Sequence, residues 1–468
     1  MKRSVTSATS LAIAIAMLWA IGPTGWASAE DDSAERLVVH EWGTFTSLQD
    51  ETGRTIGGIN TDDEAVPDFV YRLADVVYPA RDLAPAFSKG ITRSHPDVEM
   101  RLETPVVYFY PPASQTGPMK LNVKVSFRGG WLTEYYPRGK AQAPGVAEGG
   151  YHFGSISADG VGTLEWNDLT VGGEGQPPAT DSRIWLAPRE VDAALVTNAE
   201  GESERYLFYR GVGKVDAPLR VVLDEPRGEL AIQEQLHAEG LAVPLPLRAM
   251  WLADIRGDGA VAYRALGAAE LTGESGRELA RVPAKFADED FSSRHLAALR
   301  HEMLAALLDD GLYADEAEAL LETWKAGYFQ SPGLRLFYLL PRQWTDSVMP
   351  LEISVPCDLT RSMVGRIEIV TSRQRDLLGR IGSFPASKSD WLWREMQRSG
   401  VDREELTKVH EGTIGVDDLG VAVPEDYAAY LGLGRFRDAL VLDSFTREPA
   451  AGLQPFVENY GLRYHAAD

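Results

Sequence analysis

The feature that most constrains the fold of this chain is an alternation of apolar and polar residues from residue 37 to about residue 266. Residues 120–127 are the clearest case, with four apolar side chains alternating with four polar ones. Successive side chains of a strand point to opposite faces, so a period of two indicates strands between a core and solvent. We therefore predict a β-rich domain over residues 30–266, with antiparallel, sandwich-like sheets.

The spacing of apolar residues becomes helical after residue 290. Ser292 is suited to cap a helix, whose apolar stripe would contain Leu296, Leu299, Met303, Leu304 and Leu307. A second helix would place on one face Ala317, Leu320, Leu321, Trp324 and Tyr328. Further patterns indicate strands at 334–340, 351–355 and 364–371, and helices near 373–381, 390–398, 402–409 and 424–431. We predict a smaller α+β domain with an αα-hairpin over residues 291–468, a polar linker over 267–290, and an α+β class overall.

Residues 1–29 have the three parts of a secretory signal peptide. Two basic residues supply the positive end, residues 11–21 form a short apolar run, and Ala27-Ser28-Ala29 offers a cleavage site. We therefore expect a mature chain that begins at Glu30 and is periplasmic or extracellular. No later stretch reaches the roughly 18 apolar residues of a membrane helix, so no membrane anchor is expected after cleavage.

An excess of acidic residues gives the chain a formal net charge of −23. Such a surface repels phosphate backbones and anionic lipids, which argues against nucleic acid or a membrane surface as a partner. Cys357 is the only cysteine, so no disulfide can form within the chain. Its place at the end of an apolar strand pattern favours a small buried filler over a reactive thiol.

The eight histidines match no template for a metal site. The chain has no His-Glu-x-x-His segment, and no two histidines share a helix face at i and i+4. The sequence also lacks a nucleophile elbow, a phosphate-binding loop and a complete calcium-binding loop. We therefore predict neither a metal site nor a cofactor.

The most unusual stretch of the chain is residues 37–46, where polar residues interrupt a β-branched, apolar run. As a strand, it would place His40 and Trp42 on one face and Glu41 on the other. If the face of Glu41 is the core face, this carboxylate needs a partner, because an unpaired buried charge is strongly unfavourable. Arg210 and Arg101 are the predicted partners.

Two alternatives follow for the polar residues of the β-rich domain. Two carboxylates beside a histidine suit glycoside hydrolysis. In that case the catalytic residues would be Glu41, Glu103 and His40. The substrate-binding side chains would then be Trp42, Trp131, Tyr135 and Arg210. Alternatively, these residues form buried ion pairs and aromatic core packing. Because no specific catalytic signature is present, we predict first a non-catalytic binding or structural role with an unknown ligand or protein partner. The second hypothesis is a hydrolase acting on glycans.

Several segments resemble those of an uncharacterised family of secreted bacterial proteins. They include His40-Glu41-Trp42-Gly43-Thr44-Phe45 and Phe208-Tyr209-Arg210-Gly211-Val212-Gly213. The resemblance spans nearly the whole mature chain and implies an exported bacterial protein. No activity, cofactor or partner is assigned to that family, so the resemblance implies no functional residue.

Overall fold

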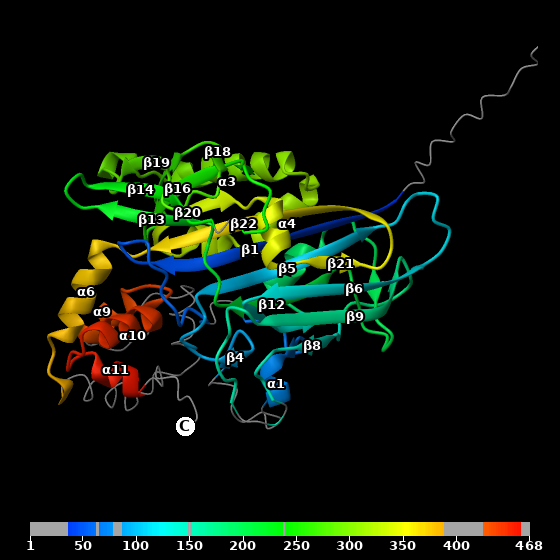
Figure 1. Ribbon diagram of the computed structural model, residues 1–468, viewed down its shortest axis with the longest axis horizontal. Helices are drawn as coiled ribbons and strands as arrows, with labels where there is room; N and C mark the ends of the chain where they lie inside the picture. Colours follow the sequence, from blue (N-terminus) through cyan, green and yellow to red (C-terminus); the bar gives the residue numbers. More distant parts are fainter. Residues whose placement is uncertain are drawn as a thin grey trace, which may run out of the picture. The chain divides into compact units, whose positions relative to one another are not determined.

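A nine-stranded sheet forms the centre of the fold in this computed structural model (Figure 1). Its neighbouring strands are antiparallel except β1 and β22, which are parallel. In spatial order they are β17 (Val261–Ala265), β16 (Met250–Ile255), β20 (Gly333–Leu339), β22 (Cys357–Ile369), β1 (Leu37–Gln49), β5 (Met100–Tyr110), β12 (Leu207–Gly213), β7 (Gly130–Tyr136) and β2 (Tyr71–Arg72).

The structure describes residues 36–61, 65–77, 87–147, 149, 152–236, 239–387 and 425–459. The predicted signal peptide and the helices predicted near 390–398 and 402–409 lie outside these ranges. Large antiparallel sheets in the N-terminal part are followed by helices, so the predicted α+β class is confirmed.

The chain is not divided at residues 267–290, where the sequence predicts a linker. This segment supplies β18 (Ala269–Leu271) and β19 (Glu278–Pro283), which pair with β15 (Leu245–Leu247) and β14 (Glu229–Glu234). Most side chains of β18 and β19 are partly or fully exposed, which explains why the segment has the polarity of a linker. Strands β20 and β22 of the predicted second domain also lie in the central sheet with β1, so the two predicted domains share one sheet.

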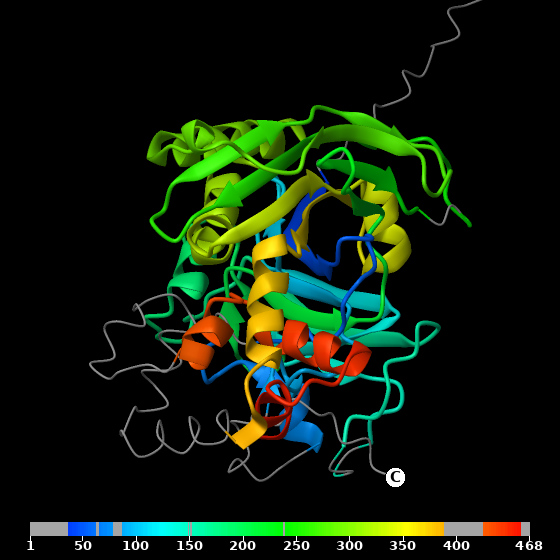
Figure 2. The same cartoon turned by 90° about the vertical axis from the view of Figure 1, so that its left-hand side faces the viewer.

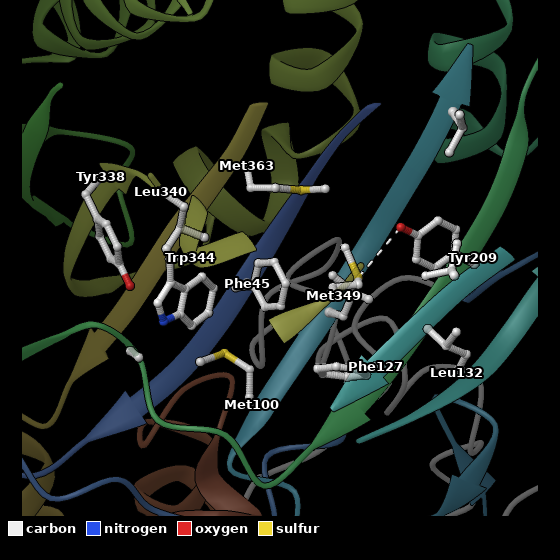
Figure 3. Packing of buried hydrophobic residues seen from close by; sticks show 14 of the residues in the cluster. Phe45, Met100, Phe127, Leu132, Tyr209, Tyr338, Leu340, Trp344, Met349 and Met363 are labelled. Atoms are coloured by element: carbon white, nitrogen blue, oxygen red, sulfur yellow. Dashed lines mark hydrogen bonds between the residues drawn. The ribbon is translucent and has the colours of Figure 1, made fainter. Parts of the chain in front are cut away.

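One face of the central sheet packs against smaller sheets, as in a sandwich. Their strands are β6 (Met119–Arg128), β8 (Lys140–Gln142), β9 (Val161–Val171), β10 (Val196–Thr197), β11 (Ser203–Glu204), β21 (Leu351–Ile353), β13 (Leu219–Asp224), β14 and β19, and β15 with β18. Figure 3 shows part of the core on this face, where Phe45 of β1 lies among Phe127, Trp344 and Met363. We call this the sandwich face of the central sheet.

Helices cover the opposite face, which we call the helical face. One apolar cluster on it involves α2 (Arg183–Arg189), α3 (Ser293–Asp309), α4 (Ala314–Thr323) and the π-helix η3 (Lys325–Gln330). A second involves α1 (Leu73–Val77), α6 (Ser372–Gly382), α9 (Glu425–Leu431), α10 (Arg437–Arg447) and α11 (Gln454–Asn459), and Figure 2 shows α6 and α9–α11 facing the viewer. The remaining short elements are β3 (Phe87–Ser88), β4 (Ile91–Thr92), η2 (Asp288–Asp290) and α5 (Arg342–Val348).

The predicted helices within the described ranges are present. The Ser292 side chain accepts a hydrogen bond from the backbone N–H of Arg294 and so caps α3. The αα-hairpin consists of α3 and α4, and the predictions at 373–381 and 424–431 match α6 and α9.

Strand β1 separates its polar residues as its alternation predicts. Val39 and Phe45 pack in the sandwich core, whereas Trp42 packs in the first apolar cluster of the helical face. Glu41 points to the sandwich face and meets Tyr209, and His40 points to the helical face and meets Glu316. The predicted separation of His40 and Trp42 from Glu41 is therefore confirmed.

Strand β5 changes its alternation at Thr104, which has a φ of 44°. At the same level the pairing of β1 with β5 shifts by one residue between Trp42 and Thr44. Such a bulge re-aims the side chains that follow it. Glu103 contacts Thr46, and Val106 packs in the same cluster as Trp42, so both residues lie on the helical face.

Candidate functional site

Glu41 is paired on the sandwich face with Arg361 of β22. The Arg361 Nε donates to Glu41 Oε2 at 2.5 Å, and the Tyr209 hydroxyl donates to Glu41 Oε1. Both charged side chains are fully buried. Burial, reinforced by Glu41, raises the pKa of Tyr209 well above its usual value, so the phenol keeps the proton that it donates.

The Nη1 of Arg361 is also occupied, whereas its Nη2 has no hydrogen-bond partner among the described residues. Its Nη1 donates to the Met349 carbonyl at 2.7 Å and to Asp346 at 2.8 Å. The predicted partners of Glu41 are thus incorrect, because Arg101 contacts Glu103 and Arg210 contacts Glu134, both on the helical face. No local sequence pattern points to Arg361, which lies opposite Glu41 only because β1 and β22 are parallel neighbours.

His40 is buried on the helical face beside α4. Its Nδ1 lies 2.8 Å from Glu316 Oε2, and the Tyr110 hydroxyl donates to Glu316 Oε1 at 2.8 Å. The Glu316 carboxylate also accepts from the backbone N–H of Tyr313, three residues earlier, as in a capping box. Burial, and then Glu316, raise the pKa of Tyr110. The group connects the start of α4 to strands β1 and β5.

Glu103 is surrounded by arginines on the helical face. It pairs with Arg101, and its oxygens lie 3.3 Å from Arg435 Nη2 and 3.6 Å from Arg366 Nη2. The Thr46 hydroxyl donates to it at 3.0 Å. Burial by itself would raise the pKa of Glu103, but Arg101, Arg366, Lys89 and this hydrogen bond outweigh it and hold the pKa at about 2.

These contacts belong to a longer row of charged residues across the helical face. Strand pairing places Arg335 of β20 beside Glu368 of β22, and Arg210 of β12 beside Glu134 of β7. Between them, Arg366 of β22 lies on one side of β1, and Arg101 and Glu103 of β5 lie on the other side. We call this row the charged seam, and its members are Arg335, Glu368, Arg366, Arg101, Glu103, Arg210 and Glu134. All seven are buried.

The seam lies between the two apolar clusters of the helical face. In β1, Trp42 belongs to the first cluster and Leu48 to the second, and the intervening Thr44 and Thr46 are buried polar residues. Val364 of β22 and Val370, which directly follows this strand, flank the seam in the same way. In both strands, buried polar residues thus lie between the apolar residues of the two clusters. Because neighbouring strands carry these polar residues at the same height in the sheet, they form one buried row.

The predicted substrate-binding aromatic residues are packed inside the protein. Trp42 and Trp131 are at most 1% exposed, and Tyr135 is 6% exposed. Trp131 lies in the second apolar cluster of the helical face, and Tyr135 in the sandwich core. The fourth predicted binding residue, Arg210, donates to Thr104 at 3.1 Å and lies 3.5 Å from Glu134. The structure does not gather these side chains around one opening.

Cys357 begins β22, where it lies opposite Leu37. Its side chain is half-buried and packs against the sandwich core. Burial, and then Asp358, raise the pKa of its thiol, which disfavours the reactive thiolate. These contacts agree with the predicted role of a small packing residue, although the side chain is less buried than predicted.

Within the described part of the chain, no three histidine, cysteine, aspartate or glutamate side chains are grouped so that they could hold a metal ion. Among the same residues, no helix is both long and apolar enough to cross a membrane.

No protein-family model matches the chain, and no curated protein is significantly similar to it. Among solved structures, the chain has a weak similarity to the mu-homology domain of yeast delta-COP-I in complex with a Dsl1 WxWxV peptide. The identity is 9% and the TM-score 0.27, with 72% of this chain and 98% of that chain covered. The same yeast domain in another structure gives 7% identity and a TM-score of 0.25, with equal coverage.

Proposed function

We propose that this chain is an exported binding protein and that it catalyses no hydrolysis. The observation that supports this most strongly is the placement of Glu41 and Glu103, which point to opposite faces of the central sheet. A glycoside hydrolase needs two carboxyl groups on either side of one bond, about 5–10 Å apart. Carboxylates separated by a sheet do not reach one substrate.

The bonding of each carboxylate also favours this proposal. Glu41 accepts from Arg361 and Tyr209, whereas Glu103 contacts arginines and Thr46. A general acid must carry a proton near neutral pH, but the pKa of Glu103 is held at about 2. His40 is the third predicted catalytic residue, and its Nδ1 is bonded to Glu316 on α4, away from Glu41.

Export is the second part of the proposal. It is supported by the signal-peptide pattern of residues 1–29 and by the resemblance of residues 40–45 to secreted bacterial proteins. A binding role is supported by the charged seam, in which arginines outnumber glutamates although the whole chain is strongly acidic. A periplasmic or extracellular protein of this kind would hold a ligand or partner rather than convert it.

The test is hydrolysis of a panel of oligosaccharides by the purified mature chain and by Glu103→Gln. Glu165→Gln is the matched control, because Glu165 forms a partly exposed pair with Lys124 on the sandwich sheets. We expect no sugar release above that of heat-denatured protein for any of the three. Release by the wild type and by Glu165→Gln, but not by Glu103→Gln, would overturn the proposal.

A further inference from the structure

His95 begins the turn of residues 95–98 between β4 and β5, and both nitrogens of its buried ring contact the backbone. Its Nε2 lies 2.7 Å from the carbonyl oxygen of Gly154, and the backbone N–H of Asp97 donates to its Nδ1 at 3.2 Å. A carbonyl oxygen only accepts and a backbone N–H only donates. The ring is therefore neutral with its proton on Nε2, because a proton on Nδ1 would face the N–H of Asp97.

A second hydrogen bond joins the same turn to residues 152–157, which form neither a helix nor a strand. The backbone N–H of Ile156 donates to Asp97 Oδ2 at 3.0 Å. The bond between the Asp97 N–H and the His95 ring fixes the residue that accepts from Ile156. The neutral imidazole thus supports both contacts between the turn and residues 152–157.

The turn is also held from another side by contacts that do not involve the imidazole ring. The backbone N–H of His95 donates to Asn60 Oδ1 at 2.8 Å. Gly57 packs so closely that a methyl group added to it would lie 2.0 Å from the carbonyl oxygen of Pro96. Loss of the ring contacts therefore leaves the turn in place and loosens residues 152–157.

Residues 152–157 cover part of the second apolar cluster of the helical face. Phe153 and Ile156 are buried and belong to this cluster together with Trp131. The ring centroids of Trp131 and Phe153 are 6.4 Å apart, and those of Trp131 and His95 are 6.0 Å apart in an edge contact. Moving residues 152–157 away would expose the Trp131 side chain.

The charged groups near His95 do not offset the cost of burying a positive ring. Among the described residues, Asp97 and Lys214 act on its charge, and they pair with each other at 3.1 Å. Burial has the largest effect and lowers the pKa of His95, and the contacts with Gly154 and Asp97 oppose it only in part. His152, in the covering segment, is exposed. The uncharged neighbours on other elements are Asn60, Trp131 and Phe153.

We propose that His95 is a pH-sensitive latch, whose protonation in acid releases residues 152–157 and uncovers Trp131. The added proton on Nδ1 points at the Asp97 N–H, so that hydrogen bond is lost. A charged ring without a compensating partner is costly inside a protein, and water reaches it once the segment moves away. The inference concerns control of a surface and does not depend on the proposed binding role.

The direction of the pH effect follows from the neutral state of the closed latch. A histidine with a lowered folded pKa stabilises the closed form above its ordinary pKa of 6.5, and this stabilisation is lost as pH falls below 6.5. The opening equilibrium of residues 152–157 should therefore increase by up to about tenfold for each pH unit below 6.5, until the folded pKa is reached.

The experiment is amide hydrogen exchange of the mature wild-type chain, read by mass spectrometry from about pH 7.5 to about pH 5 and corrected for the intrinsic exchange rate. We expect the protection of residues 152–157 to fall in acid while that of residues 120–127 in β6 stays constant. Constant protection of residues 152–157, or an equal fall in both segments, would overturn the inference.

His95→Gln cannot gain a proton, so residues 152–157 should have the same protection at every pH in this range. His152→Gln is the matched control, because His152 lies in the same segment but is exposed, and it should respond to pH as the wild type does. A wild-type response in His95→Gln, or its loss in His152→Gln, would show that His95 is not the switch. These outcomes are separate from the hydrolysis test of the proposed function.

If His95→Gln does not fold, exchange at the imidazole Cε1 of the wild-type histidines replaces it, because this exchange reports the pKa of each histidine. We expect His95 to titrate below pH 6.5 and over the same range in which residues 152–157 lose protection. Titration of His95 at or above 6.5, or outside that range, would contradict the latch.

Discussion

Glu41 and Arg361 lie opposite each other on two parallel neighbouring strands, β1 and β22, and form an ion pair. The side chains of both residues are fully buried. Their contact joins segments 320 residues apart in the sequence. The same two strands carry Thr46 and Arg366 to the other face of the sheet. One strand pair thus places a closed ion pair on the sandwich face and the middle of the charged seam on the helical face.

Replacing Glu41 by Ala should destabilise the protein by about 3–5 kcal/mol, because it leaves Arg361 buried without its carboxylate. The free energy of unfolding in urea measures the loss. Asp358→Ala is the control, since Asp358 and its partner Arg36 are both more than half exposed, and exposed pairs contribute at most about 1 kcal/mol. Equal stabilities of Glu41→Ala and the wild type would contradict the pairing.

The double variant Glu41→Leu with Arg361→Met should lose less stability than the sum of the two single variants. Each single change leaves one buried charge unpaired, whereas the double change removes both. We expect a coupling of at least about 1 kcal/mol in a double-mutant cycle measured by urea unfolding. Additive losses would mean that the two side chains do not interact.

Protonation of Glu103 in acid should lower the free energy of unfolding. The pKa of Glu103 is about 2 in the folded protein, compared with an ordinary value of 4.5. A carboxyl group with a lowered folded pKa stabilises the protein above its unfolded pKa, and this stabilisation is lost as pH falls from about 4.5 towards 2.

The test compares the wild type with Glu103→Gln, which cannot ionise. Above pH 5 the wild type should be more stable, and the difference between the two should shrink as the pH approaches 2. Urea unfolding at several pH values gives this difference directly. A difference that stays constant over this range would show that the folded state does not lower the pKa of Glu103.

Gly365 is a packing constraint in β22. A methyl group at this position would lie 2.2 Å from the ring of Tyr338, so Gly365→Ala should destabilise by at least about 1–3 kcal/mol. Apart from its own helix backbone, no described residue has an atom within 4 Å of the same added carbon at Gly379 in α6. Gly379→Ala should therefore be neutral or stabilising by up to about 1 kcal/mol. Thermal unfolding of both variants separates the effects, and the reverse order of Tm values would refute this packing.

The sequence was most informative where a local pattern decides the structure. Alternation in β1 correctly separated Glu41 from His40, and Ser292 correctly marked the start of α3. Both features depend on residues close together in the chain, where strand geometry and capping act directly.

The partners of the charged residues could not be found in this way. Arg361 reaches Glu41 through a parallel strand pair, and Glu316 reaches His40 from a helix 276 residues away. The alternation has the same period for any pairing of strands, so it does not say which arginine faces which glutamate. The prediction of a linker over residues 267–290 is wrong because the partly exposed strands β18 and β19 have the polar composition of a linker.

The most direct test of the binding role is native mass spectrometry of the mature protein, isolated from the exported fraction of the cells that make it. We expect a chain that begins at Glu30 and carries extra non-covalent mass, which is lost on denaturation. A wild-type chain at its bare mass that also releases sugar from a glycan would contradict the proposed binding role.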